Sequence, residues 1–132
     1  MNEPDFQKHA QNAFRFLVER CGFAQTTGEP SMVRYTSKDV MVEVNYSGRG
    51  EVDVIIDEDP PSYRFQLSLF LHAFHPEVWK KLGDGIAYSD DEVQRELKRL
   101  SDAMQRYGKP LLAHDRQAFE KMKTVKWWEL PS

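Results

Sequence analysis

The feature that most constrains the fold is a run of alternating apolar and polar residues between positions 32 and 56. Three segments have this pattern, 32–36, 40–46 and 51–56, and the glycine-containing segment 47–50 separates the last two. Successive side chains of a strand point to opposite faces, so each segment has one apolar and one polar face. The pattern predicts an antiparallel meander.

The two faces of the meander predict different environments for neighbouring residues. The apolar face carries valines at alternate positions: Val42, Val44, Val52 and Val54. We expect it to pack beneath helices, while Glu43 and Asp53 on the other face stay hydrated. Paired carboxylates can act as general acid and base when one is desolvated, so Glu43 and Asp53 are also candidate catalytic residues.

Helical spacing precedes the meander. Apolar residues recur at intervals of four, three, four and four: Phe6, Ala10, Ala13, Leu17 and Cys21. This spacing predicts one amphipathic helix, and Gly22 is expected to end it. A first strand is expected over residues 23–27, with a turn over 28–31.

The C-terminal half predicts further helices. Residues 57–62 are expected to be a loop, because Pro60 and Pro61 cannot lie in a central strand. Residues 63–74 fit both strand alternation and helical spacing, and their leucine content favours a short extended segment followed by a helix. Ser89 and Glu92 form a capping-box pattern that begins a helix ending at Gly108, and a last helix is expected from residue 110 onward.

The expected fold is a single α+β domain over residues 1–132: an N-terminal helix, an antiparallel sheet of three or four strands, and C-terminal helices packed on one face. The chain is 40% hydrophobic and 30% charged, a composition typical of folded domains. A chain of 132 residues can bury a core without disulfides or metal. Its one cysteine excludes an internal disulfide.

Charge and hydropathy restrict the expected partners and location. The net charge of −3 gives no basic patch for nucleic acid or an anionic membrane, so neither is expected as a partner. No apolar run approaches the length of a membrane span, and the N-terminus lacks a basic region followed by an apolar one. The expected location is the cytoplasm.

Two histidines are the strongest candidates for a metal site. His72 and His75 are three residues apart on an expected helix, and two such histidines plus a carboxylate can hold zinc. The nearest acid, Glu77, lies beyond Pro76, so the third ligand is missing at helical spacing. No metal and no other cofactor is expected.

Cys21 is a candidate nucleophile, with His9 or His114 as its base. The same cysteine also continues the apolar stripe of the first helix. A buried thiol behaves as a small hydrophobic group, so we expect Cys21 to belong to the core.

Acidic and aromatic residues suggest a protein-binding surface. Asp57, Glu58 and Asp59 are expected in a solvated loop, where their charge would guide the approach of a basic protein. The candidate anchors that a partner would bury are the three tryptophans: Trp79, Trp127 and Trp128. Lysines beside the last two could also stack single-stranded nucleic acid, but the acidic composition disfavours that alternative.

The order of these segments resembles small bacterial proteins of uncharacterised function, some of which resemble the immunity proteins of toxin systems. The segments that carry the resemblance are residues 16–23, 33–37, 40–44 and 50–54, a leucine-rich segment that starts at Tyr63, and residues 106–112. One departure is His114-Asp115, where the resemblance implies Gly-Asp. The resemblance implies a compact binding protein and brings no catalytic residues with it.

The favoured function is therefore non-catalytic protein binding, in its most specific form the neutralisation of a cognate toxin by occlusion. One alternative is a small-molecule enzyme or hydrolase, whose site would lie near Glu43, Asp53, His72 and His75. The other is a structural homodimer, built by pairing of sheet edges or through the helical face.

Overall fold

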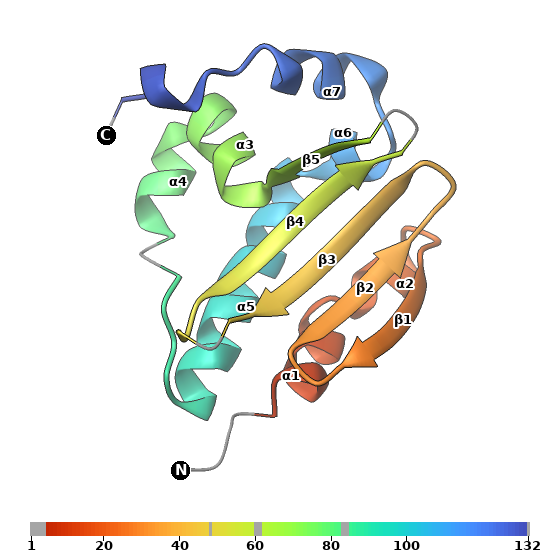
Figure 1. Cartoon of the computed structure of the whole chain (residues 1–132), viewed down its shortest axis with the longest axis vertical. Helices are drawn as coiled ribbons and strands as arrows, with labels where there is room; N and C mark the ends of the chain where they lie inside the picture. The colour runs from red at the N-terminus through yellow and green to blue at the C-terminus, as the bar shows by residue number, and fades with distance from the viewer. Residues whose placement is uncertain (1–4, 48, 60–61, 83–84, 132) are drawn as a thin grey trace.

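The computed structural model describes residues 5–47, 49–59, 62–82 and 85–131, with Thr27 and Gly28 described by their backbone alone. Pro60 and Pro61, which the sequence places in a loop, lie outside the described residues. The fold is α+β, with helices before and after a five-stranded antiparallel sheet (Figure 1).

The sheet is a meander in which each strand pairs with the next along the chain. Its strands are β1 (Ala24–Glu29), β2 (Met32–Thr36), β3 (Val40–Tyr46), β4 (Val52–Glu58) and β5 (Tyr63–Gln66). The sheet exceeds the expected three or four strands because the extended segment at residue 63 pairs with β4. A helix then begins at Leu67, so the preferred interpretation of residues 63–74 is confirmed.

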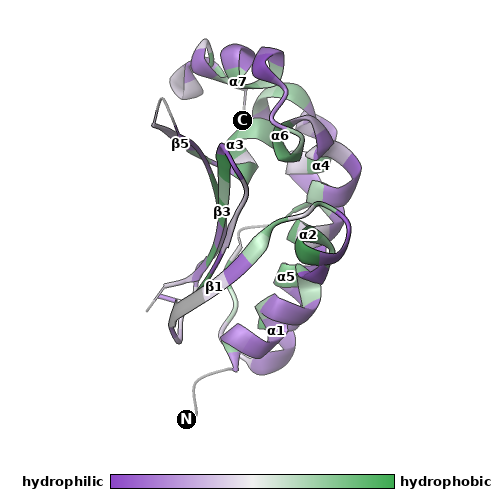
Figure 2. Ribbon diagram, turned by 90° about the vertical axis from the view of Figure 1, so that its right-hand side faces the viewer, coloured by the Kyte–Doolittle hydropathy of each residue, from purple (hydrophilic) through white to green (hydrophobic). Residues whose placement is uncertain are grey.

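The helices pack on one face of the sheet (Figure 2). They are α1 (Phe6–Ala13), α2 (Arg15–Glu19), α3 (Leu67–Phe74), α4 (Pro76–Lys81), α5 (Asp90–Tyr107), α6 (Lys109–Leu112) and α7 (Arg116–Lys123), followed by the 3-10 turn η1 (Trp127–Glu129). Because β4 pairs Ile56 with Val42 and Val54 with Val44, these apolar side chains form one buried layer beneath the helices. The predicted burial of the valine face is confirmed.

The longest helix, α5, begins where the capping box predicted. The Ser89 hydroxyl accepts a hydrogen bond from the Glu92 backbone N–H at 3.2 Å, and the Glu92 carboxylate accepts one from the Ser89 N–H at 3.1 Å. These two bonds satisfy backbone donors that the first turn of a helix otherwise leaves free. The helix ends at Tyr107, directly before Gly108.

The expected single N-terminal helix is broken at Phe14, and α2 ends at Glu19. Both Phe14 and Phe16 are buried. In a straight helix, residues two positions apart, such as Phe14 and Phe16, are separated by about 200° and face nearly opposite sides. The break therefore allows both rings to enter the core. The prediction that Cys21 lies on a buried helical stripe is wrong, because Cys21 follows the end of α2 and is exposed.

The last helix is also broken, between α6 and α7, at His114. The backbone of His114 has a φ of 54°, a left-handed conformation that glycine adopts most easily. It is the position at which the resemblance implied glycine. The next residue, Asp115, caps α7 by accepting a hydrogen bond from the Gln117 N–H at 2.9 Å.

Candidate functional site

The most exposed aromatic surface of the described chain is the turn η1. Trp127 and Trp128 have 68% and 65% of their surface exposed. Their rings pack edge to face, with centroids 5.9 Å apart, so the two indoles form one unit. We call these two residues the tryptophan pair.

The tryptophan pair is held in place on both sides. Before it, the backbone carbonyl of Met122 in α7 accepts a hydrogen bond from the Tyr63 hydroxyl at 2.9 Å. After it, the carbonyl of Pro131 is hydrogen-bonded to the His72 ring of α3. The His72 ring also stacks on Trp79, with ring centroids 3.6 Å apart. Trp79, the third expected anchor, is therefore half-buried and supports the turn from inside.

Glu58 does not lie in a solvated loop, and that expectation is wrong. It is the last residue of β4 and pairs with Val40, which places its side chain on the helix-covered face with 4% of the residue exposed. His114 Nε2 lies 2.8 Å from Glu58 Oε2, and Lys123 Nζ lies 3.1 Å from Oε1. Burial raises the pKa of Glu58, but the hydrogen bond with His114 and the adjacent positive charge of Lys123 outweigh it and hold the pKa below its ordinary value. Glu58 thus attaches α7, which leads to the tryptophan pair, to the sheet.

The two acids beside Glu58 have different surroundings. Asp57 also belongs to β4, and its Oδ2 lies 3.7 Å from Nη1 of Arg64 on the face away from the helices. Asp59 is exposed, and its backbone N–H donates to the Asp39 carbonyl at 3.0 Å. Of the three expected steering residues, only Asp59 is therefore exposed.

On the sheet face opposite the helices, Glu43 is buried rather than hydrated, with 4% of its surface exposed. Arg34 lies opposite it on β2 and donates to Glu43 Oε1 at 2.9 Å, while Arg64 reaches Oε2 from β5. Asn45 adds a third hydrogen bond at 3.3 Å. Burial raises the pKa of Glu43, but these hydrogen bonds outweigh it and lower the pKa. The carboxylate is the charged centre of a structural network.

Asp53 lies on the same face in a different environment. Gln66 Nε2 is 3.4 Å from Asp53 Oδ2. Burial raises the pKa of Asp53, and the neighbouring charge of Glu51 raises it further. Glu43 and Asp53 therefore have separate partners and opposite pKa shifts.

The histidines do not join these carboxylates. His72 contacts Trp79, whereas the His75 ring packs against Tyr107 with centroids 4.7 Å apart, so the two imidazoles face different neighbours. Among the residues that the structure describes, no group of three or more His, Cys, Asp or Glu side chains is arranged to hold a metal ion. The four residues of the enzyme alternative belong to separate contact networks.

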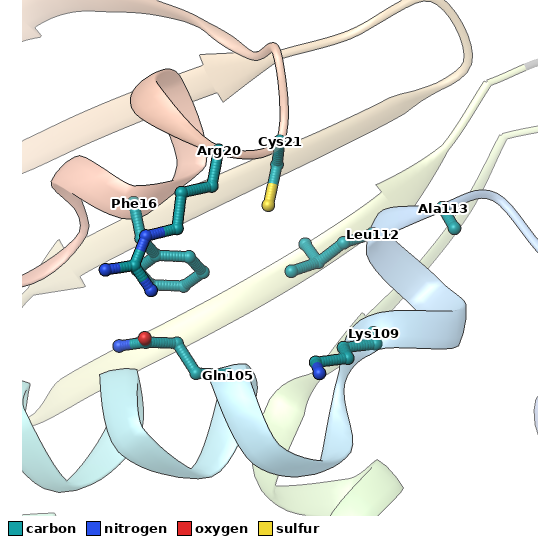
Figure 3. A pocket seen from close by; sticks show the side chains of 7 residues that line it. All are labelled: Phe16, Arg20, Cys21, Gln105, Lys109, Leu112 and Ala113. Atoms are coloured by element: carbon teal, nitrogen blue, oxygen red, sulfur yellow. The ribbon is translucent and has the colours of Figure 1, made fainter.

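The candidate bases for Cys21 are also engaged elsewhere. His9 Nε2 lies 2.8 Å from Asp90 Oδ1, at the start of α5, and His114 is bound to Glu58. Cys21 instead faces a pocket of about 560 Å³ between the end of α2 and the α5–α6 junction (Figure 3). Burial raises the pKa of its thiol, and the charge of Arg20 opposes that shift.

Sequence patterns could not reveal this pocket. Its lining combines residues from both ends of the chain: Phe16, Arg20, Cys21, Gln105, Lys109, Leu112 and Ala113. Neither segment contains a local ligand-binding motif, so only the tertiary fold places them on opposite sides of one pocket.

Within the described ranges, none of the helices is both long enough and apolar enough to cross a bilayer. Comparison with protein-family models, curated proteins and solved structures found no match to this chain.

Proposed function

We propose that this protein is a non-catalytic protein-binding domain whose anchor is the tryptophan pair. The observation that carries the proposal is the exposure of two adjacent indoles, 68% and 65%, on a turn attached at both ends. Tryptophan is enriched among the residues that dominate protein–protein binding energy. A turn already held in one conformation also loses little entropy on binding.

The exposed surface is large enough to give substantial affinity. A tryptophan buries roughly 150–250 Å² in a core, so two-thirds exposure leaves roughly 100–170 Å² per side chain for a partner. At about 25 cal/mol per Å², covering that surface stabilises a complex by about 2–4 kcal/mol per tryptophan. The two side chains together offer a gross gain of about 4–8 kcal/mol, and the loss of translational and rotational freedom on association offsets a large part of it.

Electrostatic guidance plays a smaller part than the sequence indicated. Glu58 is compensated by His114 and Lys123, and Asp57 lies beside Arg64, so Asp59 is the exposed acid that remains to attract a basic partner. A single exposed charge changes the association rate more than the affinity. The resemblance to immunity proteins makes a toxin the first class of partner to test, with occlusion as the mechanism.

A homodimer is the second candidate, because β1 is an edge strand of six residues whose outer side pairs with no strand in the described chain. Such an edge can pair with the same edge of another copy. Sedimentation velocity between 5 and about 500 µM separates the two candidates, because edge pairing predicts a concentration-dependent dimer.

The test uses the tagged protein and its Trp127→Ala/Trp128→Ala variant in quantitative pull-downs from the native cell. The matched control is Tyr88→Ala, which removes an aromatic ring that is 58% exposed just before α5. Helix α5 begins at the end of the molecule away from the C-terminal turn (Figure 1). We expect one stoichiometric partner with the parent and the control, and at least a thirtyfold weaker Kd for the double variant. Titration calorimetry with the purified partner measures that ratio.

Retention of the partner by the double variant within threefold of the parent affinity would contradict the proposed anchor. Asp59→Lys is the separate test of guidance. It should slow the association with a basic partner at low salt and have little effect on dissociation.

A further inference from the structure

We propose that the pocket between α2 and the α5–α6 junction binds a small organic anion with an aromatic or otherwise apolar body. This site is separate from the tryptophan pair, and the proposal does not depend on the protein partner. It rests on the size of the pocket, on its two kinds of wall, and on the state of its cationic side chains.

The pocket has the dimensions and lining of a ligand site. Its volume of about 560 Å³ lies within the roughly 300–1,000 Å³ typical of small-molecule pockets. Leu112 of α6 supplies apolar surface on one side, and the small accessible part of the buried Phe16 ring of α2 lines the other. An aromatic or aliphatic body can therefore lie against both and be removed from water.

Two cations face the same space. In Figure 3, the side chains of Arg20 and Lys109 extend toward the gap between α2 and α5, together with the Gln105 amide. Within the ranges that the structure describes, neither Arg20 nor Lys109 has a carboxylate at ion-pair distance, whereas Arg34 and Arg64 are both paired. Two positive charges beside an apolar wall and without acidic partners attract an anion.

The polar wall is partly held in position before any ligand arrives. Gln105 Nε2 donates to Ser101 Oγ at 3.1 Å, and the Ser101 hydroxyl donates to the Ala13 carbonyl at 2.6 Å. These bonds orient the Gln105 amide through its nitrogen, and no described residue donates a hydrogen bond to its oxygen. The planar guanidinium of Arg20 suits a carboxylate, sulfonate or phosphate oxygen pair, and Lys109 adds a mobile point charge.

Cys21 makes occupancy measurable, because it is the one cysteine of the chain and it lines the pocket. The probe is 8-anilinonaphthalene-1-sulfonate, which combines an aromatic body with a single anionic group. Its fluorescence reports binding, and the rate at which neutral 4,4′-dithiodipyridine modifies Cys21 reports the place of binding. We expect saturating probe to slow that modification at least fivefold.

The decisive variant is Arg20→Gln/Lys109→Gln, which leaves the apolar walls intact. We expect it to weaken probe binding at least tenfold and to abolish protection of Cys21. Arg49→Gln/Lys80→Gln is the matched control, because it removes the same charge from exposed positions outside the pocket lining. The control should bind the probe as the parent does, and circular dichroism should show that both variants are folded.

Two results would overturn the proposal. The first is that the probe does not slow the modification of Cys21 in the parent, or slows it equally in Arg20→Gln/Lys109→Gln. The other is equal affinity of the parent for N-phenyl-1-naphthylamine, the same aromatic body without the sulfonate, because the cations would then contribute nothing. The Trp127→Ala/Trp128→Ala variant should keep full probe binding, so failure of the anion site and failure of the protein-binding proposal are distinguishable.

Discussion

The substitution Tyr35→Phe should stabilise this protein, although it removes a polar group from the core. Tyr35 lies in β2 and is fully buried. Within the part of the chain that the structure describes, its hydroxyl has no hydrogen-bond partner. A hydroxyl that leaves water without gaining a partner lowers stability, so its removal should raise the free energy of unfolding.

The expected gain follows from burial of that single oxygen. An unsatisfied buried hydroxyl costs about 1–3 kcal/mol. Phenylalanine keeps the ring and its contacts but leaves a small void where the oxygen was. That void lowers stability and offsets part of the gain. We therefore expect the free energy of unfolding to rise by about 1 kcal/mol at pH 7.

A pH series checks the same reasoning independently. Burial raises the pKa of Tyr35 to about 12, whereas an unfolded tyrosine titrates near 10. Because the folded pKa is the higher one, the contribution of the neutral phenol is complete below about pH 10 and is lost as the pH rises toward 12. The parent should lose up to about 2 kcal/mol over this range from Tyr35, so the advantage of Tyr35→Phe should grow with pH.

Urea unfolding followed by tryptophan fluorescence measures both effects, at pH 7 and again at pH 10.5. Tyr88→Phe is the control, since Tyr88 is exposed and its hydroxyl can be hydrated. The control should change stability by less than about 0.5 kcal/mol. A Tyr35→Phe variant less stable than the parent by 0.5 kcal/mol or more, roughly the size of one lost hydrogen bond, would show that the hydroxyl has a partner and would refute the reasoning.

Two further predictions concern the corner held by Glu58 and a glycine turn. Glu58→Gln should lower stability at pH 7 by about 1–2 kcal/mol, a range discounted because His114 and Lys123 are partly exposed. Since the folded pKa of Glu58 is depressed, the stability that its carboxylate contributes is present above about pH 4.5 and is lost as the pH falls through the folded pKa. Urea unfolding should therefore show a smaller stability difference between parent and Glu58→Gln at pH 3.5 than at pH 7. An equal difference at both pH values would contradict this prediction. Gly50→Ala should destabilise by about 1–2 kcal/mol, because its φ is 84° and a Cβ would lie 2.7 Å from Cε1 of the Tyr88 ring and 3.1 Å from the Ala87 carbonyl oxygen. Gly22→Ala, with a φ of 75° and nothing within 4 Å of its Cβ, isolates the backbone part, and thermal unfolding should show it to be the milder change.

The strand pattern was readable because side-chain alternation is local. Val42 and Val44 face the core simply because successive residues of a strand point to opposite sides. The same reasoning predicted hydration for Glu43, and there it was wrong. What buries Glu43 is a pair of arginines, Arg34 from β2 and Arg64 from β5, and the second comes from a strand whose place in the sheet no local pattern specifies.

Glu58 shows the same limit at the end of a strand. Its neighbours in sequence are acids followed by prolines, a composition typical of a loop. In the structure β4 extends through Glu58, because β5 continues the pairing as far as Tyr63, and His114 and Lys123 compensate the charge. Contacts across more than fifty residues thus override the local signal.

The amino-acid sequence by itself determined the α+β class, the buried valine layer and the capped start of α5 at Ser89, because periodicity and capping act between residues a few positions apart. Tertiary structure alone decided which charges are compensated, that Cys21 lines a pocket with Arg20 and Lys109, and that Trp79 supports a turn on which Trp127 and Trp128 stay exposed. The physical reason is that ion pairing, desolvation and pocket formation depend on distances between segments far apart in the chain, and those distances exist only after the helices have packed on the sheet.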